Sequence, residues 1–318
     1  MAERLFEFDL YRLIVLDQED VFEFFGKKAT NNSDYLSIIQ HACTSQFDFA
    51  TEGQRNEYRW SLRDFLRHDD YPEWRHGAIA SIRLARSMVE QTAQIVTDET
   101  IVEGKSHAVP PPAVPIRLIF YMERHLVAVE RNSILMATQG WHDALHAMFD
   151  AAAAAAGFRS SLRLEPVPEA NQVLEAFMSF QRLTRIRVTL RLPNPEITRS
   201  AEELYKQMLN GGIKEYLNDM SSPSGLSQQE GGLPHAVASL AQEGYKKGEV
   251  VLTGVREGKR KRVRTGRHAA RGQLEQVRDF VRGAMTIAQA RETQSALSAV
   301  INEIDRIHPG ESLGKDSE

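Results

Sequence analysis

The chain has 318 residues, 42% of them hydrophobic and 26% charged, and its formal net charge is −4. This composition excludes disordered and collagen-like chains, and no stretch approaches the roughly 18 consecutive apolar residues of a membrane-spanning helix, so we expect no membrane association. The single cysteine, Cys43, excludes an internal disulfide, Cys-rich zinc modules and CxxC redox chemistry, which all need at least two thiols.

The chain begins with alternating apolar and polar residues, which predict a strand over roughly 4–16. The acidic residues there argue against a signal peptide, so we expect a cytoplasmic protein. Ser33 provides an N-cap for a short helix to about residue 44, and two further strands are predicted at 58–62 and 79–84. The proline-rich run 110–115 favours extended polyproline geometry and predicts a stiff connector.

Beyond residue 115 the pattern predicts a mixture of strands and helices. Apolar segments at 116–122 and 125–130 predict a hairpin, and a helix is predicted from about Gln139 to Gly157, where glycine ends it. The remaining predicted elements are strands at 160–165, 183–192 and 249–255 and helices at 169–180, 201–211, 235–243, 269–285 and 287–307. The Ser- and Gly-rich segment 221–234 predicts a flexible loop, which is a candidate lid or partner-binding loop.

These elements show no regular βα alternation, and no Gly-x-Gly-x-x-Gly motif follows a strand, which argues against a doubly wound nucleotide-binding fold. We expect an α+β protein with mixed or antiparallel sheets, packed helices and a C-terminal helical hairpin. The predicted division is an N-terminal α+β domain (1–157), a C-terminal α+β domain with a basic hairpin (158–308) and a disordered polar tail (309–318).

Positive charge is concentrated in one segment of the chain. Residues 256–271 contain eight Arg or Lys and one acid, a formal +7, which leaves −11 on the rest of a chain whose total is −4. Such a patch on an acidic body is typical of a local surface for a polyanion. The alternative is a solvated hairpin without a ligand.

Two predicted strands carry arginines at every second position, opposite their apolar residues. Arginine suits phosphate because its planar fork donates two parallel hydrogen bonds. Our leading hypothesis is therefore nucleic-acid binding through backbone contacts, without sequence readout and without aromatic stacking. The predicted contact residues are Arg260, Lys261, Arg262, Arg264 and Arg267, with Arg185, Arg187 and Arg191 as a second row. Alternatively, these arginines face neighbouring carboxylates and bind nothing.

A second hypothesis is a metal-dependent hydrolase or nuclease. His142, His146 and Asp150 recur every four residues and form one stripe of the predicted helix, and two imidazoles one turn apart can bind zinc. Asp143 stands where a His-Glu-x-x-His motif has its glutamate, and its shorter side chain falls short of a metal-bound water. The alternative is an amphipathic helix with half-exposed histidines. We predict no cofactor, and the sequence assigns no catalytic residue.

A third hypothesis is a protein-interaction module that dimerises through the C-terminal helices at 269–307. Apolar residues of the last helix recur at spacings of three and four, which is typical of a helical seam, with Gln294 as its polar position. The favoured interpretation is that this seam packs on the protein's own domain, and the alternative is an interface with a second copy or a protein partner.

Four segments carry a resemblance to a known family: Leu5–Arg12, Phe120–Glu130, the Leu192–Glu196 turn and Gly244–Gly248. Together they resemble bacterial chains that form a family of unknown function. The resemblance spans most of the chain and implies a bacterial cytosolic protein. Because such families often lie in defence gene clusters, it also favours an accessory role in antiphage defence. None of the four segments is a chemical signature, so the resemblance implies no catalytic residue.

Overall fold

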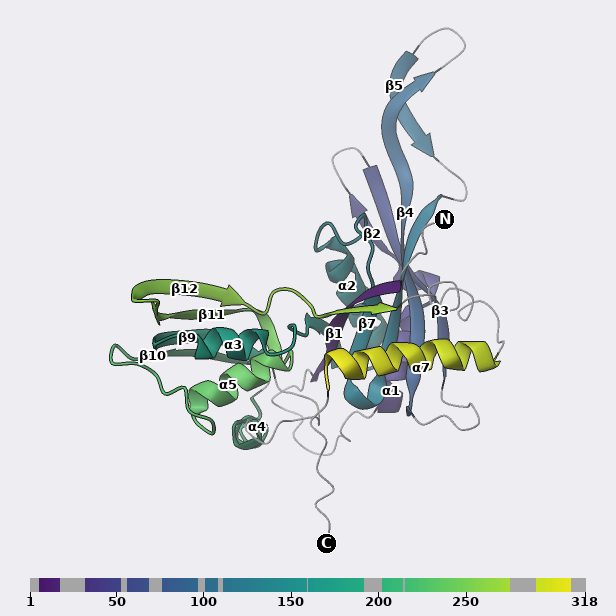
Figure 1. Ribbon diagram of the computed structural model, residues 1–318. Coiled ribbons are helices and arrows are strands. Elements are labelled where there is room, and N and C mark those ends of the chain that lie inside the picture. Colours follow the sequence, from purple (N-terminus) through teal and green to yellow (C-terminus); the bar gives the residue numbers. More distant parts are fainter. Residues whose placement is uncertain are drawn as a thin grey trace.

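The computed structural model describes residues 6–17, 32–52, 56–68, 76–96, 101–107, 111–158, 160–191, 202–213, 215–274 and 290–309. These residues form two antiparallel sheets with helices packed on them, so the predicted α+β class is confirmed (Figure 1). No helix among them is long and apolar enough to span a membrane.

The first sheet contains nine strands of the described chain, in the order β13-β1-β7-β6-β4-β3-β2, with β5 added on β4 and β8 on β1. Their bounds are β1 Phe6–Asp17, β2 Phe49–Glu52, β3 Asn56–Arg67, β4 Ile79–Val96, β5 Ile101–His107, β6 Ala113–Tyr121, β7 Leu126–Glu130, β8 Ser160–Pro166 and β13 Arg271–Leu274. The division predicted at residue 157 stays a prediction, and the sheet draws on strands from both sides of it.

Helices cover both faces of the first sheet. The helices α1 (Asn32–Ala42) and α2 (Gly140–Ala155) pack on one face, where Leu118 and Phe120 of β6 are buried. The helix α7 (Ala290–Ile307) packs on the other face, where Ile119 is buried. A central strand with both faces covered is mostly apolar, which explains the apolar residues of β6. The charged residue of this strand, Arg117, forms an ion pair with Glu130.

The second sheet has the order β10-β9-β11-β12. Its strands are β9 Arg182–Arg191, β10 Glu215–Ser221, β11 Lys246–Arg256 and β12 Lys259–Thr265, and its helices are α3 Gln172–Met178, α4 Glu202–Asn210 and α5 Leu233–Gln242. Ile186, Val188 and Leu190 of β9 are buried together with residues of these helices on one face. The other face of the sheet carries no described helix (Figure 1).

A buried arginine joins the two sheets to the end of α7. Arg12 of β1 is 1% exposed, and its guanidinium lies 4.7 Å from the ring centroid of Tyr245, which precedes β11. Its Nη1 donates to the carbonyl of Arg124 at 2.7 Å and its Nε to the carbonyl of Glu243 at 3.0 Å. Its Nη2 lies 3.0 Å from Nε2 of His308, directly after α7. One guanidinium thus contacts three separate segments of the chain.

Three details differ from the sequence-based expectations. The helix predicted at 269–285 is wrong over 271–274, because these residues pair with the outer edge of β1, Leu274 opposite Phe6. Pro115 lies within β6 rather than in a connector, at a position beyond the pairing with β7, where a missing N–H breaks no bond to that strand. The strands β2, β5 and β10 are not predicted from the sequence. Residues 192–200, 275–289 and 310–318, which include parts of the predicted elements and tail, lie outside the described residues.

The seam of the last predicted helix packs on the protein's own sheet. Leu297, Ile301 and Ile304 of α7 are buried against Phe6 and Phe8 of β1. This packing agrees with the favoured interpretation of the seam. The side chains are covered by the protein's own sheet and need no second copy.

Candidate anion-binding site

The strand register of the second sheet brings the two arginine rows onto one face. On β11, Thr253 lies opposite both Arg185 of β9 and Arg262 of β12. Val251 of the same strand lies opposite Arg187 and Arg264. Directly opposed residues of neighbouring strands point to the same side of a sheet. The side chains of both rows therefore share the face that is opposite to α3 and α5.

A register shift extends this arrangement by one more pair. The pairing of β11 with β9 shifts between Thr253 and Gly254, so that Val255 lies opposite both Arg182 and Arg260. A Cβ atom at Gly254 would lie 2.3 Å from the carbonyl oxygen of Arg182, so only glycine allows this close approach. Arg182 belongs to the site but was outside the sequence prediction, because a bulge leaves no signal in the local alternation.

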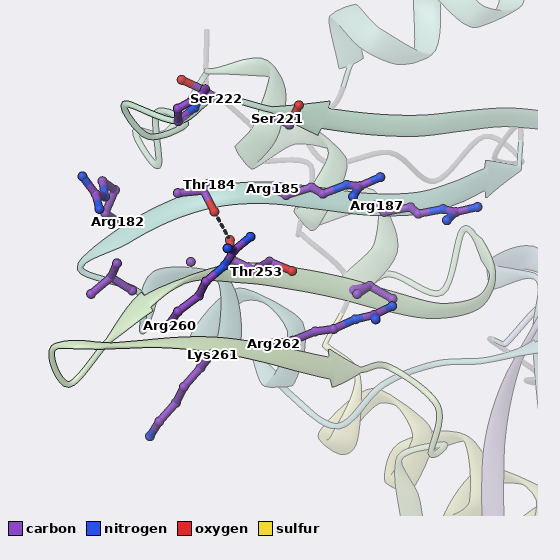
Figure 2. Close-up of a pocket in the computed structure, with 14 residues that line it drawn as sticks. Arg182, Thr184, Arg185, Arg187, Ser221, Ser222, Thr253, Arg260, Lys261 and Arg262 are labelled. Atoms are coloured by element: carbon purple, nitrogen blue, oxygen red, sulfur yellow. Dashed lines mark hydrogen bonds between the residues drawn. The ribbon is translucent and has the colours of Figure 1, made fainter.

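Between the two rows lies a hollow of about 990 Å³, which we call the arginine hollow. Short side chains of β11, Val251, Thr253 and Val255, lie between the rows. Figure 2 shows arginines of β9 and of β12 on either side of β11. The residues that line it are Arg182, Thr184, Arg185, Arg187, Ser221, Ser222, Pro223, Val251, Thr253, Gly254, Val255, Arg260, Lys261 and Arg262. None of them is aromatic.

The arginines of the hollow differ in whether a carboxylate holds them. Arg187, Arg260 and Arg262 are exposed and form no hydrogen bond or ion pair with any described residue. Arg185 donates two hydrogen bonds to Asp219 of β10, at 2.7 and 2.5 Å. These hydrogen bonds from Arg185 lower the pKa of Asp219, and the charge of Arg187 adds to the effect, so Asp219 stays ionised.

The other predicted basic residues have different surroundings. Arg264 and Arg267 are 62% and 70% exposed and lie 3.6 and 3.8 Å from the Glu249 carboxylate. Lys261 forms an ion pair with Glu257 and points away from the arginines in Figure 2. Arg191 is buried, with Nη1 2.6 Å from Glu165 and Nε 3.0 Å from Glu215. Arg191 therefore ties β9 to β8 and β10 and presents no group to a ligand.

The loop predicted at 221–234 forms one edge of the hollow and is hydrogen-bonded to β9 and to α3. The Leu226 amide donates to the Leu183 carbonyl at 2.6 Å, and the Gln228 side chain donates to the Phe177 carbonyl at 2.6 Å. Ser222, whose amide donates to the Thr184 carbonyl, lies at the rim of the hollow.

The predicted metal stripe on α2 has structural partners. Nε2 of His142 lies 2.7 Å from the carbonyl of Leu164, and Nε2 of His146 accepts a hydrogen bond from the Leu164 amide at 3.0 Å. Asp150 accepts two hydrogen bonds from Arg163, both at 2.8 Å. The three side chains thus hold α2 against β8, and within the described ranges no group of three His, Cys, Asp or Glu residues could hold a metal ion.

Comparison with known proteins identifies the family and no function. The family described as "Domain of unknown function (DUF4747)" matches residues 26–277, which is most of the chain, so the protein belongs to this family and the resemblance noted in the sequence is confirmed. A search of curated proteins found no match.

Proposed function

We propose that this member of the DUF4747 family binds nucleic acid through its phosphate backbone, in the arginine hollow of the second sheet. The observation that supports this most directly is that Arg187, Arg260 and Arg262 face one hollow without a carboxylate partner among the described residues. Guanidinium groups in such a setting are free to form charge-assisted, bidentate hydrogen bonds with phosphate oxygens.

The charge distribution supports the same proposal. The segment 256–271 carries a formal +7 within a chain whose total is −4, so the remaining surface repels a polyanion. Binding would therefore concentrate at the hollow rather than spread over the molecule. Backbone contacts position a protein without specifying bases, so we expect little sequence preference. An accessory role in antiphage defence rests on the family resemblance alone.

The test is fluorescence anisotropy with labelled DNA and RNA at low and at high salt. The double variant Arg260→Ala/Arg262→Ala should raise Kd roughly tenfold or more, because each lost charge-assisted hydrogen bond contributes about 1.5–3 kcal/mol and about 1.4 kcal/mol corresponds to a factor of ten. The control Lys259→Ala/Arg306→Ala removes the same charge outside the hollow and should change Kd less than about twofold. Equal Kd values for the two double variants, or no binding by the parent protein, would refute the proposal.

A further inference from the structure

Arginines of β9 and β12 are arranged as opposed pairs across β11. Five of these six arginines line the hollow, and the sixth, Arg264, lies 3.6 Å from the Glu249 carboxylate. Each pair flanks one residue of β11: Arg182 and Arg260 flank Val255, Arg185 and Arg262 flank Thr253, and Arg187 and Arg264 flank Val251. The two cationic rows thus run parallel to β11, with short side chains between them. This is the shape of a trough rather than of a flat basic patch.

Standard strand geometry sets the dimensions of this trough. Neighbouring strands lie about 4.8 Å apart, so the backbones that carry the two rows are about 9.6 Å apart. Alternate residues of an antiparallel strand repeat every roughly 6.8 Å, so the three pairs extend over about 14 Å. The trough therefore presents a pair of guanidiniums at regular steps along one direction.

This geometry fits one extended polynucleotide strand. Phosphates of an extended strand recur at about the same step as the arginine pairs, so each phosphate could lie between two guanidiniums. A duplex is much wider than the distance between the two arginine rows, so it would contact only the outer ends of these side chains. No aromatic residue among those that the structure describes lines the hollow, so these residues provide no platform on which the bases could stack.

We infer that the arginine hollow binds a single strand of nucleic acid along β11, with three consecutive phosphates inward and the bases pointing to solvent. The inference rests on the proposed function and specifies its ligand. Recognition depends on the phosphodiester chain alone, so DNA bases can be exchanged or removed without loss of affinity. With three phosphates neutralised, log K should fall with log salt concentration with a slope of about −2 for a single strand.

The experiment compares three labelled ligands by anisotropy with the full chain: single-stranded oligothymidylate, a duplex of the same length, and an oligomer of the same length that consists of abasic sites. The single strand should bind at least tenfold tighter than the duplex, and the abasic oligomer should bind within about twofold of oligothymidylate. Equal or tighter binding of the duplex overturns the inference and leaves the proposed function intact. Loss of binding on base removal also overturns it, and absence of binding to all three ligands overturns both.

A variant of the trough floor provides a second test. Thr253→Tyr keeps every arginine but fills the space between Arg185 and Arg262, and tyrosine is well accepted in strands. It should weaken single-strand binding at least tenfold while the circular dichroism spectrum and Tm stay those of the parent. A folded Thr253→Tyr protein with parental affinity would show that the ligand does not enter the trough.

Discussion

Single side chains decide which arginines can meet a ligand. Arg187 and Arg191 lie on the same strand and the same face, yet Arg187 is exposed whereas Arg191 is buried between Glu165 and Glu215. The sequence predicts their common face from the alternation of apolar residues. It cannot predict the carboxylates, because these come from β8 and β10, and a partner from a distant strand leaves no local signal. The sequence alone therefore groups Arg191 with the exposed arginines.

Asp219 is the carboxylate that binds Arg185, and under the proposed function it would compete with phosphate for this side chain. In Asp219→Asn the carboxylate charge is lost and Arg185 becomes available to phosphate, so we expect Kd for single-stranded DNA to fall about three- to tenfold in anisotropy titrations. The control Asp64→Asn removes the same charge beside Arg83 in the first sheet and should change Kd much less. Equal effects of the two variants would show that only the net charge matters.

Substitutions of Arg191 and Arg187 should separate an effect on the stability of the fold from an effect on nucleic-acid binding. Arg191→Met leaves the buried Glu165 carboxylate without this partner, and we expect the free energy of unfolding to fall by about 3–5 kcal/mol. Arg187→Met removes an exposed side chain, so stability should change by less than about 0.5 kcal/mol while nucleic-acid affinity falls. Urea denaturation followed by circular dichroism measures the first effect. Similar destabilisation by both variants would contradict the assignment.

At the scale of elements, local periodicity predicts most helices and strands, because each has one face in a core. Two of the exceptions, β10 and β13, have physical reasons. In β10, only Asn218 is fully buried, so its residues show little apolar alternation. In β13, the apolar spacing that indicates a helix is overridden by pairing with the edge of β1. The shared face of the arginine rows depends on the register of β11 with two partners, which the sequence does not reveal.

The contact between α2 and β8 leads to a prediction of how the free energy of unfolding changes at low pH. Burial first, and then the charges of His142, Arg163 and Arg191, lower the pKa of His146 to about 2. Below the ordinary histidine pKa of 6.5 the unfolded chain takes up a proton that the folded chain does not. The free energy of unfolding should therefore fall as pH decreases below 6.5, by up to about 1.4 kcal/mol per pH unit from this residue.

Urea denaturation between pH 6.5 and pH 5 measures this dependence. His146→Gln retains an acceptor for the Leu164 amide but no titrating ring, so its pH slope should be smaller than that of the parent. His125, whose pKa burial and Arg12 lower to about 4, contributes part of the slope that remains. An unchanged slope in His146→Gln would show that His146 does not carry the effect.

At the scale of the whole molecule, the two sheets are held together by charged groups in buried positions. Arg12 contacts Arg124, Glu243, Tyr245 and His308, which lie in three separate parts of the chain. Such a set of partners cannot be predicted from the sequence, where Arg12 is one basic residue in a strand pattern. The order of the predicted elements indicates the class of fold, but the assembly of the sheets depends on contacts between residues up to 296 positions apart.

The expected result for Arg12→Met is a loss of at least about 3 kcal/mol of stability, because several buried acceptors lose their donor together. In the parent protein, tryptophan fluorescence from Trp60 and Trp141 of the first core and hydrogen exchange of β11 amides should report one common transition. In the variant, the β11 amides should exchange earlier than the fluorescence changes. Coincident transitions and unchanged stability in Arg12→Met would show that this arginine does not join the sheets.

The central position of Arg12 also limits how the protein can be divided. Tyr245, directly before β11, lies against this guanidinium, so a fragment limited to the second sheet would leave this aromatic ring exposed at the start of β11. Limited proteolysis should accordingly yield no long-lived half of the protein that retains the trough, and cleavage within β1 should abolish binding even though β1 contributes no residue to the trough.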